Sequence, residues 1–102
     1  MSVNLPPEAR LTQQERANYL EDFIQEVNRE IDAILAGRDF EREIKALRFR
    51  ISLLDQSRAY SARVTGLQAE LRQVESDFAA LKPQLDALDA ERRFYRSQTS
   101  GY

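Results

Sequence analysis

The side chains that could do chemistry in this 102-residue chain are carboxylates, arginines, lysines and hydroxyls. The sequence contains no His and no Cys. It therefore lacks disulfides, and it lacks the imidazole and thiolate groups that serve as general bases, nucleophiles and zinc ligands. Acid clusters such as Glu21, Asp22 and Glu26 are typical of a solvated helix face, because metal binding by carboxylates needs oxygen ligands that converge. We predict no catalytic residue, no bound metal and no cofactor, and we expect a protein that is not an enzyme.

A cluster of basic and aromatic residues near the C-terminus is a candidate docking site. Arg, Tyr and Phe are favoured anchors of protein interfaces. A partner could dock on this cluster. Alternatively, the aromatic residues could complete an apolar stripe while the arginines favour the negative end of a helix dipole. The cluster consists of Arg92, Arg93, Phe94, Tyr95 and Arg96.

The elements that would position these residues are helices. Apolar residues recur every three and four positions, which is the helical period, and the chain has only 3 Gly and 3 Pro. Thr12 and Glu15 form a capping-box pattern, Gly37 follows the last apolar residue of the first segment, and Asp39 is a suitable N-cap for the second. The predicted organisation is an N-terminal arm at 1–11, one helical domain at 12–96 with helices near 12–36, 39–56 and 57–96, and a flexible tail at 97–102.

An apolar seam with heptad spacing runs through the second and third predicted helices. A helix with one apolar stripe must bury it against another helix. We expect this seam to join the chain to a partner or to other copies of itself. Its residues are Ile44, Leu47, Ile51, Leu54, Val64, Leu67, Leu71, Val74, Phe78, Leu81, Leu85 and Leu88.

The heptad frame breaks between Leu54 and Val64. These residues are ten positions apart, where an unbroken frame would give four or eleven. Either the helix continues with a change of phase, or a turn occurs and Ser57 caps a new helix. Residues 55–60 contain no Gly and no Pro, which favours the continuous helix. Pro83 leaves the frame unshifted, which predicts a kink within the helix and not an end.

Two arrangements could bury the stripes. The first two helices could form an antiparallel hairpin around Gly37, because residues 12–36 carry 2 bases and 6 acids, whereas residues 38–64 carry 7 bases and 4 acids. In the other arrangement, two copies pair in parallel, which aligns four attractive charge pairs against one repulsive pair. The attractive pairs would be Glu43–Arg48, Arg50–Asp55, Asp77–Lys82 and Glu91–Arg96, and the repulsive pair Glu70–Glu75.

The sequence thus predicts an all-α fold: an elongated helical hairpin with a long, kinked coiled-coil helix, or alternatively a compact three-helix bundle. The predicted function is a structural or assembly protein, a scaffold or adaptor that acts through helix–helix contacts. The alternatives are a small partner-binding module, such as a chaperone or inhibitor, and a nucleic-acid-associated regulator.

We expect protein partners, a homo-oligomer or a place in a larger assembly. The basic residues between Arg38 and Arg63 are interrupted by acids and lack a nucleic-acid-binding motif, so we do not expect nucleic acid as the partner. No apolar run approaches the roughly 20 residues of a membrane span, and the first ten residues do not resemble a secretory signal. We therefore expect a cytoplasmic protein, or one within a particle assembled in the cytoplasm.

Overall fold

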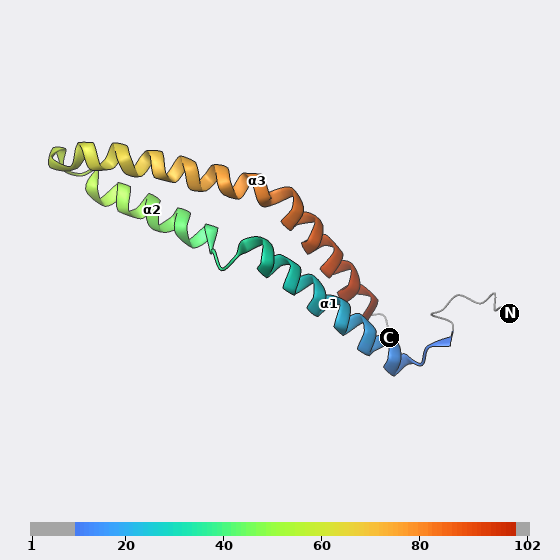
Figure 1. Cartoon of the computed structure of the whole chain (residues 1–102). Helices are drawn as coiled ribbons and strands as arrows, with labels where there is room; N and C mark the ends of the chain where they lie inside the picture. The colour runs from blue at the N-terminus through green and yellow to red at the C-terminus, as the bar shows by residue number, and fades with distance from the viewer. Residues whose placement is uncertain (1–9, 100–102) are drawn as a thin grey trace. The chain divides into compact units, whose positions relative to one another are not determined.

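The computed structural model describes residues 10–99, and all the regular structure in that range is helical. The elements are α1 (Gln13–Leu35), α2 (Phe40–Leu54), the short 3-10 helix η2 (Arg58–Tyr60) and α3 (Ser61–Thr99) (Figure 1). The all-α prediction is confirmed. Most of the predicted N-terminal arm lies outside the described residues.

Side chains cap the first two helices as the sequence predicts. The backbone N–H of Glu15 donates to Thr12 Oγ1 at 3.0 Å, and the N–H of Thr12 donates to Glu15 Oε1 at 3.1 Å. This reciprocal pair is the capping box. At α2, the N–H of Arg42 donates to Asp39 Oδ1 at 3.1 Å. Both caps satisfy backbone donors that have no partner within the first turn of a helix.

The chain leaves α1 through two residues with left-handed backbone conformation. Gly37 has φ 81° and Ala36 has φ 50°. Glycine adopts this conformation without the steric cost that a Cβ imposes. The residues therefore end α1 sharply, and α2 begins three positions after Gly37.

A turn, and not a continuous helix, separates α2 from α3. The N–H of Ser57 donates to the carbonyl of Leu54 at 3.2 Å, and Ser57 is extended, with φ −133° and ψ 132°. Its hydroxyl accepts the N–H of Ala59 and caps η2. The prediction of an unbroken helix here is wrong. The alternative, a turn in which Ser57 caps a new helix, is confirmed.

The third helix contains 39 residues and continues through Pro83. The prediction that this proline does not end the helix is confirmed. The helix also includes Ser97–Thr99, which we had assigned to the tail. Ser97 Oγ donates to the carbonyl of Phe94, and Thr99 Oγ1 to that of Arg96, both at 2.7 Å. These hydroxyls bond to the last turns of the helix itself, which places α3 three residues beyond its predicted end.

The chain divides into two packing units. Within the described residues, one unit contains residues 10–34 and 85–99, and the other contains residues 35–84. Hence α1 packs with the C-terminal part of α3, and α2 packs with the N-terminal part of α3 (Figure 1). The predicted helical hairpin with one long helix is confirmed, but the pairing of the first two helices and the alternative three-helix bundle are wrong. The helical hairpin in the structure is formed by α2 and α3.

Candidate partner-binding surface

The predicted seam of the second unit is buried within the chain. Leu67 is completely buried, and Val64 and Val74 are 5% and 7% exposed. Phe40 stacks on Phe78 with ring centroids 5.1 Å apart and planes 10° apart. The remaining seam residues of this unit are half-buried, namely Ile44, Leu47, Ile51, Leu54, Leu71, Phe78 and Leu81.

Packing of α2 on α3 thus accounts for the seam of this unit without a second chain. Leu85 and Leu88 belong to the other unit, where they are half-buried. That any of these residues also joins separate chains stays a prediction.

Ion pairs flank this buried seam. Arg38 Nη2 lies 2.7 Å from Glu43 Oε1, and Arg38 Nη1 lies 3.5 Å from Asp77 Oδ2. Arg48 Nη2 lies 2.8 Å from Glu75 Oε2. The hydrogen bonds from Arg38 hold the pKa of Glu43 below its ordinary value. Three of these side chains, Glu43, Arg48 and Asp77, belong to the attractive pairs of the parallel-dimer arrangement, and their charges are already compensated by contacts within the chain.

The C-terminal basic and aromatic cluster is largely occupied by contacts within the first unit. Arg92 Nη1 donates to Asn28 Oδ1 at 2.9 Å, and its Nη2 donates to Asp89 Oδ1 at 2.7 Å. Arg93 lies 2.9 Å from Asp89 Oδ2. These arginines hold the pKa of Asp89 below its ordinary value, chiefly through the hydrogen bond from Arg92. The Arg92 side chain is thus held between an oxygen acceptor on α1 and another on α3.

The aromatic residues of the cluster differ in exposure. Tyr95 is half-buried, its ring centroid lies 5.5 Å from that of Phe23, and its hydroxyl donates to Glu91 at 2.6 Å. This hydrogen bond raises the pKa of Tyr95. Phe94, in contrast, is 60% exposed. Arg96 is also exposed on α3. The structure thus leaves Phe94 as the aromatic residue of the cluster most open to a partner.

Among the large apolar side chains of the described residues, the most exposed belongs to α2. Phe49 is 66% exposed, and Leu53, one helical turn later, is 51% exposed. A helix turns about 100° per residue, which places both opposite the buried seam. We define the α2 outer face as Arg42, Lys45, Ala46, Phe49 and Leu53.

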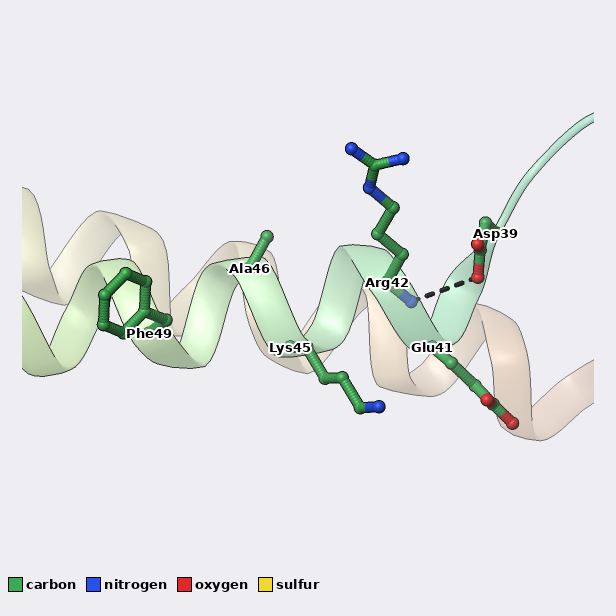
Figure 2. A pocket seen from close by; sticks show the side chains of 6 residues that line it. All are labelled: Asp39, Glu41, Arg42, Lys45, Ala46 and Phe49. Carbon is green, nitrogen blue, oxygen red and sulfur yellow. Dashed lines mark hydrogen bonds between the residues drawn. The ribbon is translucent and has the colours of Figure 1, made fainter.

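Figure 2 shows four residues of this face, Arg42, Lys45, Ala46 and Phe49, along one side of α2, where with Asp39 and Glu41 they line an open surface depression. The carboxylate of Asp39 is engaged in capping the helix. The face therefore combines two large apolar side chains with two exposed bases.

Sequence reasoning missed the α2 outer face. Phe49 and Leu53 fall outside the heptad frame, so they did not enter the seam, although their spacing of four was visible. The sequence analysis treated the basic residues between Arg38 and Arg63 as one group. The structure separates them, since Arg38 and Arg48 pair with acids, whereas Arg42 and Lys45 lie beside exposed apolar groups.

Exposed apolar residues also occur elsewhere in the described chain. Tyr60 in η2 is 50% exposed. In α1, Tyr19 is 47% exposed and Phe23 is 46% exposed. Large apolar groups left exposed in neighbouring positions are typical of protein-binding surfaces.

No family model, curated protein or solved structure matches the chain. The function is therefore inferred from the exposed surface of the chain. Residues 10–99 contain no group of three or more acidic residues placed to hold a metal ion. In the same range, no helix has both the length and the apolar character needed to cross a membrane.

Proposed function

We propose that this chain is a non-enzymatic structural or assembly protein that binds protein partners through helix–helix contacts. The observation that carries the proposal is the α2 outer face, where Phe49 and Leu53 are more than half exposed next to Arg42 and Lys45. Aromatic residues and arginine are enriched at interfaces, and two such apolar side chains one turn apart suit a facing helix.

The internal use of the seam supports this assignment to the outer face. Because α2 already buries one stripe against α3, its exposed apolar residues do not serve the packing of their own unit. Exposing them leaves apolar area in contact with water, which a partner would remove. A scaffold or adaptor uses this physical principle, and it needs no reacting group.

Site-specific photo-crosslinking tests the proposal. We would place p-benzoylphenylalanine at position 49, and in a matched control at Ser76, which is exposed on α3. We expect a crosslinked protein product, either with another protein or with a second copy, from position 49 and little from position 76. Equal absence of protein products at both positions would overturn the proposal.

A second candidate function is a small partner-binding module, such as a chaperone or an inhibitor. It is favoured by the same exposed face, because a monomer that carries an apolar stripe can cover one groove of another protein. Position 49 would then crosslink to that protein, while the chain alone would have the mass of a monomer.

A further inference from the structure

We infer that the α2 outer face binds α1 of a second copy of this chain, with the two helices antiparallel. This inference rests on the proposed function and names its partner. It follows from a second exposed stripe, on α1, whose spacing and order of apolar and charged residues complement those of the α2 outer face.

The stripe on α1 consists of Tyr19, Phe23, Glu26 and Glu30, which we call the α1 stripe. All four residues are exposed. Their spacing of four, three and four places them along one side of the helix. The aromatic residues occupy the N-terminal half of the stripe and the acids the C-terminal half. Phe23 also contacts the Tyr95 ring in its own unit, yet 46% of its surface remains exposed.

The α2 outer face has the same spacing in the opposite chemical order. Arg42, Ala46, Phe49 and Leu53 are separated by four, three and four residues, with Lys45 next to Ala46. The bases therefore occupy the N-terminal half and the large apolar side chains the C-terminal half. Both stripes have the same length, from residue 19 to 30 and from residue 42 to 53.

Antiparallel pairing brings each kind of residue to its complement. The aromatic half of one stripe then faces the apolar half of the other, and the acids face the bases. The opposed positions are Tyr19 with Leu53, Phe23 with Phe49, Glu26 with Ala46 beside Lys45, and Glu30 with Arg42. Parallel pairing would instead place the aromatic residues against the bases and the acids against the apolar residues.

Charge also favours α1 as the occupant over other classes of molecule. The α1 stripe carries two exposed acids, Glu26 and Glu30, and the α2 outer face carries two exposed bases, Arg42 and Lys45. A nucleic acid would offer phosphates to Arg42 and Lys45 but would leave Phe49 and Leu53 without an apolar surface. Binding to an anionic lipid surface scales with the apolar area that the membrane buries. The α2 outer face offers only two large apolar side chains, so such binding would be weak. The α1 stripe offers acids and aromatic groups at matching positions.

The absence of cysteine makes the contact testable by disulfide trapping. We would prepare Tyr19→Cys and Leu53→Cys as separate proteins, mix them and oxidise them mildly. The inference predicts a disulfide-linked heterodimer. In the matched control, Gln25→Cys replaces Tyr19→Cys, because residue 25 is exposed on a different side of α1, about 120° around the helix from Tyr19. This control should form little heterodimer with Leu53→Cys.

A charge swap provides the second test. Glu26→Lys with Glu30→Lys reverses the α1 stripe, and Arg42→Glu with Lys45→Glu reverses the α2 outer face. We expect each double variant alone to self-associate at least about tenfold more weakly than wild type. Mixing the two should restore association, because the reversed stripes are again complementary. Circular dichroism of each variant establishes that its helices are retained.

The outcomes separate this inference from the proposed function. A monomer at all concentrations, or no preference for the 19–53 disulfide over the 25–53 control, would overturn the inference. The inference would also be overturned if wild type did not self-associate but bound anionic vesicles or duplex DNA, and the Arg42→Glu, Lys45→Glu variant did not bind them. If position 49 still crosslinked to a different protein, the proposed function would stand while the inference failed.

Discussion

Replacing Phe49 by Ala should weaken association while leaving the fold intact. Phe49 is 66% exposed. A phenylalanine buries on the order of 200 Å² when it is fully covered, so a partner can remove about 130 Å² of this residue from water. At about 25 cal/mol per Å² this sets an upper bound of roughly 3 kcal/mol, or about a hundredfold in Kd.

The matched comparison is Phe40→Ala. Phe40 lies on the same helix, but it is 3% exposed and stacks on Phe78. Its truncation should cost about 3–5 kcal/mol of unfolding free energy, because it leaves a cavity in the core of the second unit. Phe49→Ala should change the unfolding free energy of the monomer by less than about 0.5 kcal/mol, as is usual for an exposed position.

Urea unfolding followed by circular dichroism measures the free energy of unfolding, at a protein concentration low enough to dissociate the copies. Light scattering over a range of concentrations measures association. The reasoning would be refuted if Phe49→Ala destabilised the fold as much as Phe40→Ala. It would equally be refuted if Phe49→Ala associated as tightly as wild type.

Three further predictions concern the fold that holds this surface. Because Arg38 lowers the pKa of Glu43, the folded state should lose the stabilisation from this pair as the pH falls below about 4.5, near the ordinary Glu value. Glu43→Gln should flatten this acidic part of a plot of melting temperature against pH. An unchanged plot would contradict the role of the pair. Arg92→Ala should cost about 1–2 kcal/mol in urea unfolding, since it leaves Asn28 without its charged donor. Arg93→Ala, whose side chain is 70% exposed, should cost less than about 0.5 kcal/mol. Equal losses would show that the partly buried hydrogen bond from Arg92 to Asn28 adds nothing to stability. Gly66→Ala should raise the unfolding free energy by about 0.5–1 kcal/mol, because the added Cβ has open space within α3. Gly37→Ala should lower the unfolding free energy by about 1 kcal/mol, because Gly37 has φ 81°. A change of the same sign for both variants would contradict this reasoning from backbone conformation.

Local features of this fold were predictable because their signals lie within a few residues of one another. The capping box of Thr12 and Glu15 depends on a spacing of three, and the cap of Asp39 depends on one side chain and one nearby N–H. The continuation of α3 through Pro83 was also readable, since the apolar frame on both sides of the proline is unshifted.

The pairing of the helices was not predictable from the same signals. A heptad stripe has the same pattern whether it faces another part of its own chain or a second copy. The opposite charges of the first two segments suggested a hairpin, yet α2 buries its stripe against α3. That choice required the turn at Ser57, which brings α3 back along α2 without any Gly or Pro.

The candidate surface was hidden for a related reason. The heptad pattern identifies the residues that form the buried seam, and Phe49 and Leu53 lie outside that pattern. Their significance depends on exposure, and exposure is known only once α2 has been placed against α3. Likewise, the Arg92 side chain could be assigned to packing only after Asn28 and Asp89 were found beside it.

The most direct test of the central claim is the molar mass of the wild-type chain and of Phe49→Ala, measured by light scattering behind a sizing column over a wide concentration range. The account predicts that wild type reaches at least twice the chain mass of 11.8 kDa, and that Phe49→Ala remains a monomer at concentrations where wild type does not. A wild-type monomer at every concentration, or equal masses for the two proteins throughout, would contradict the claim that the α2 outer face joins two copies.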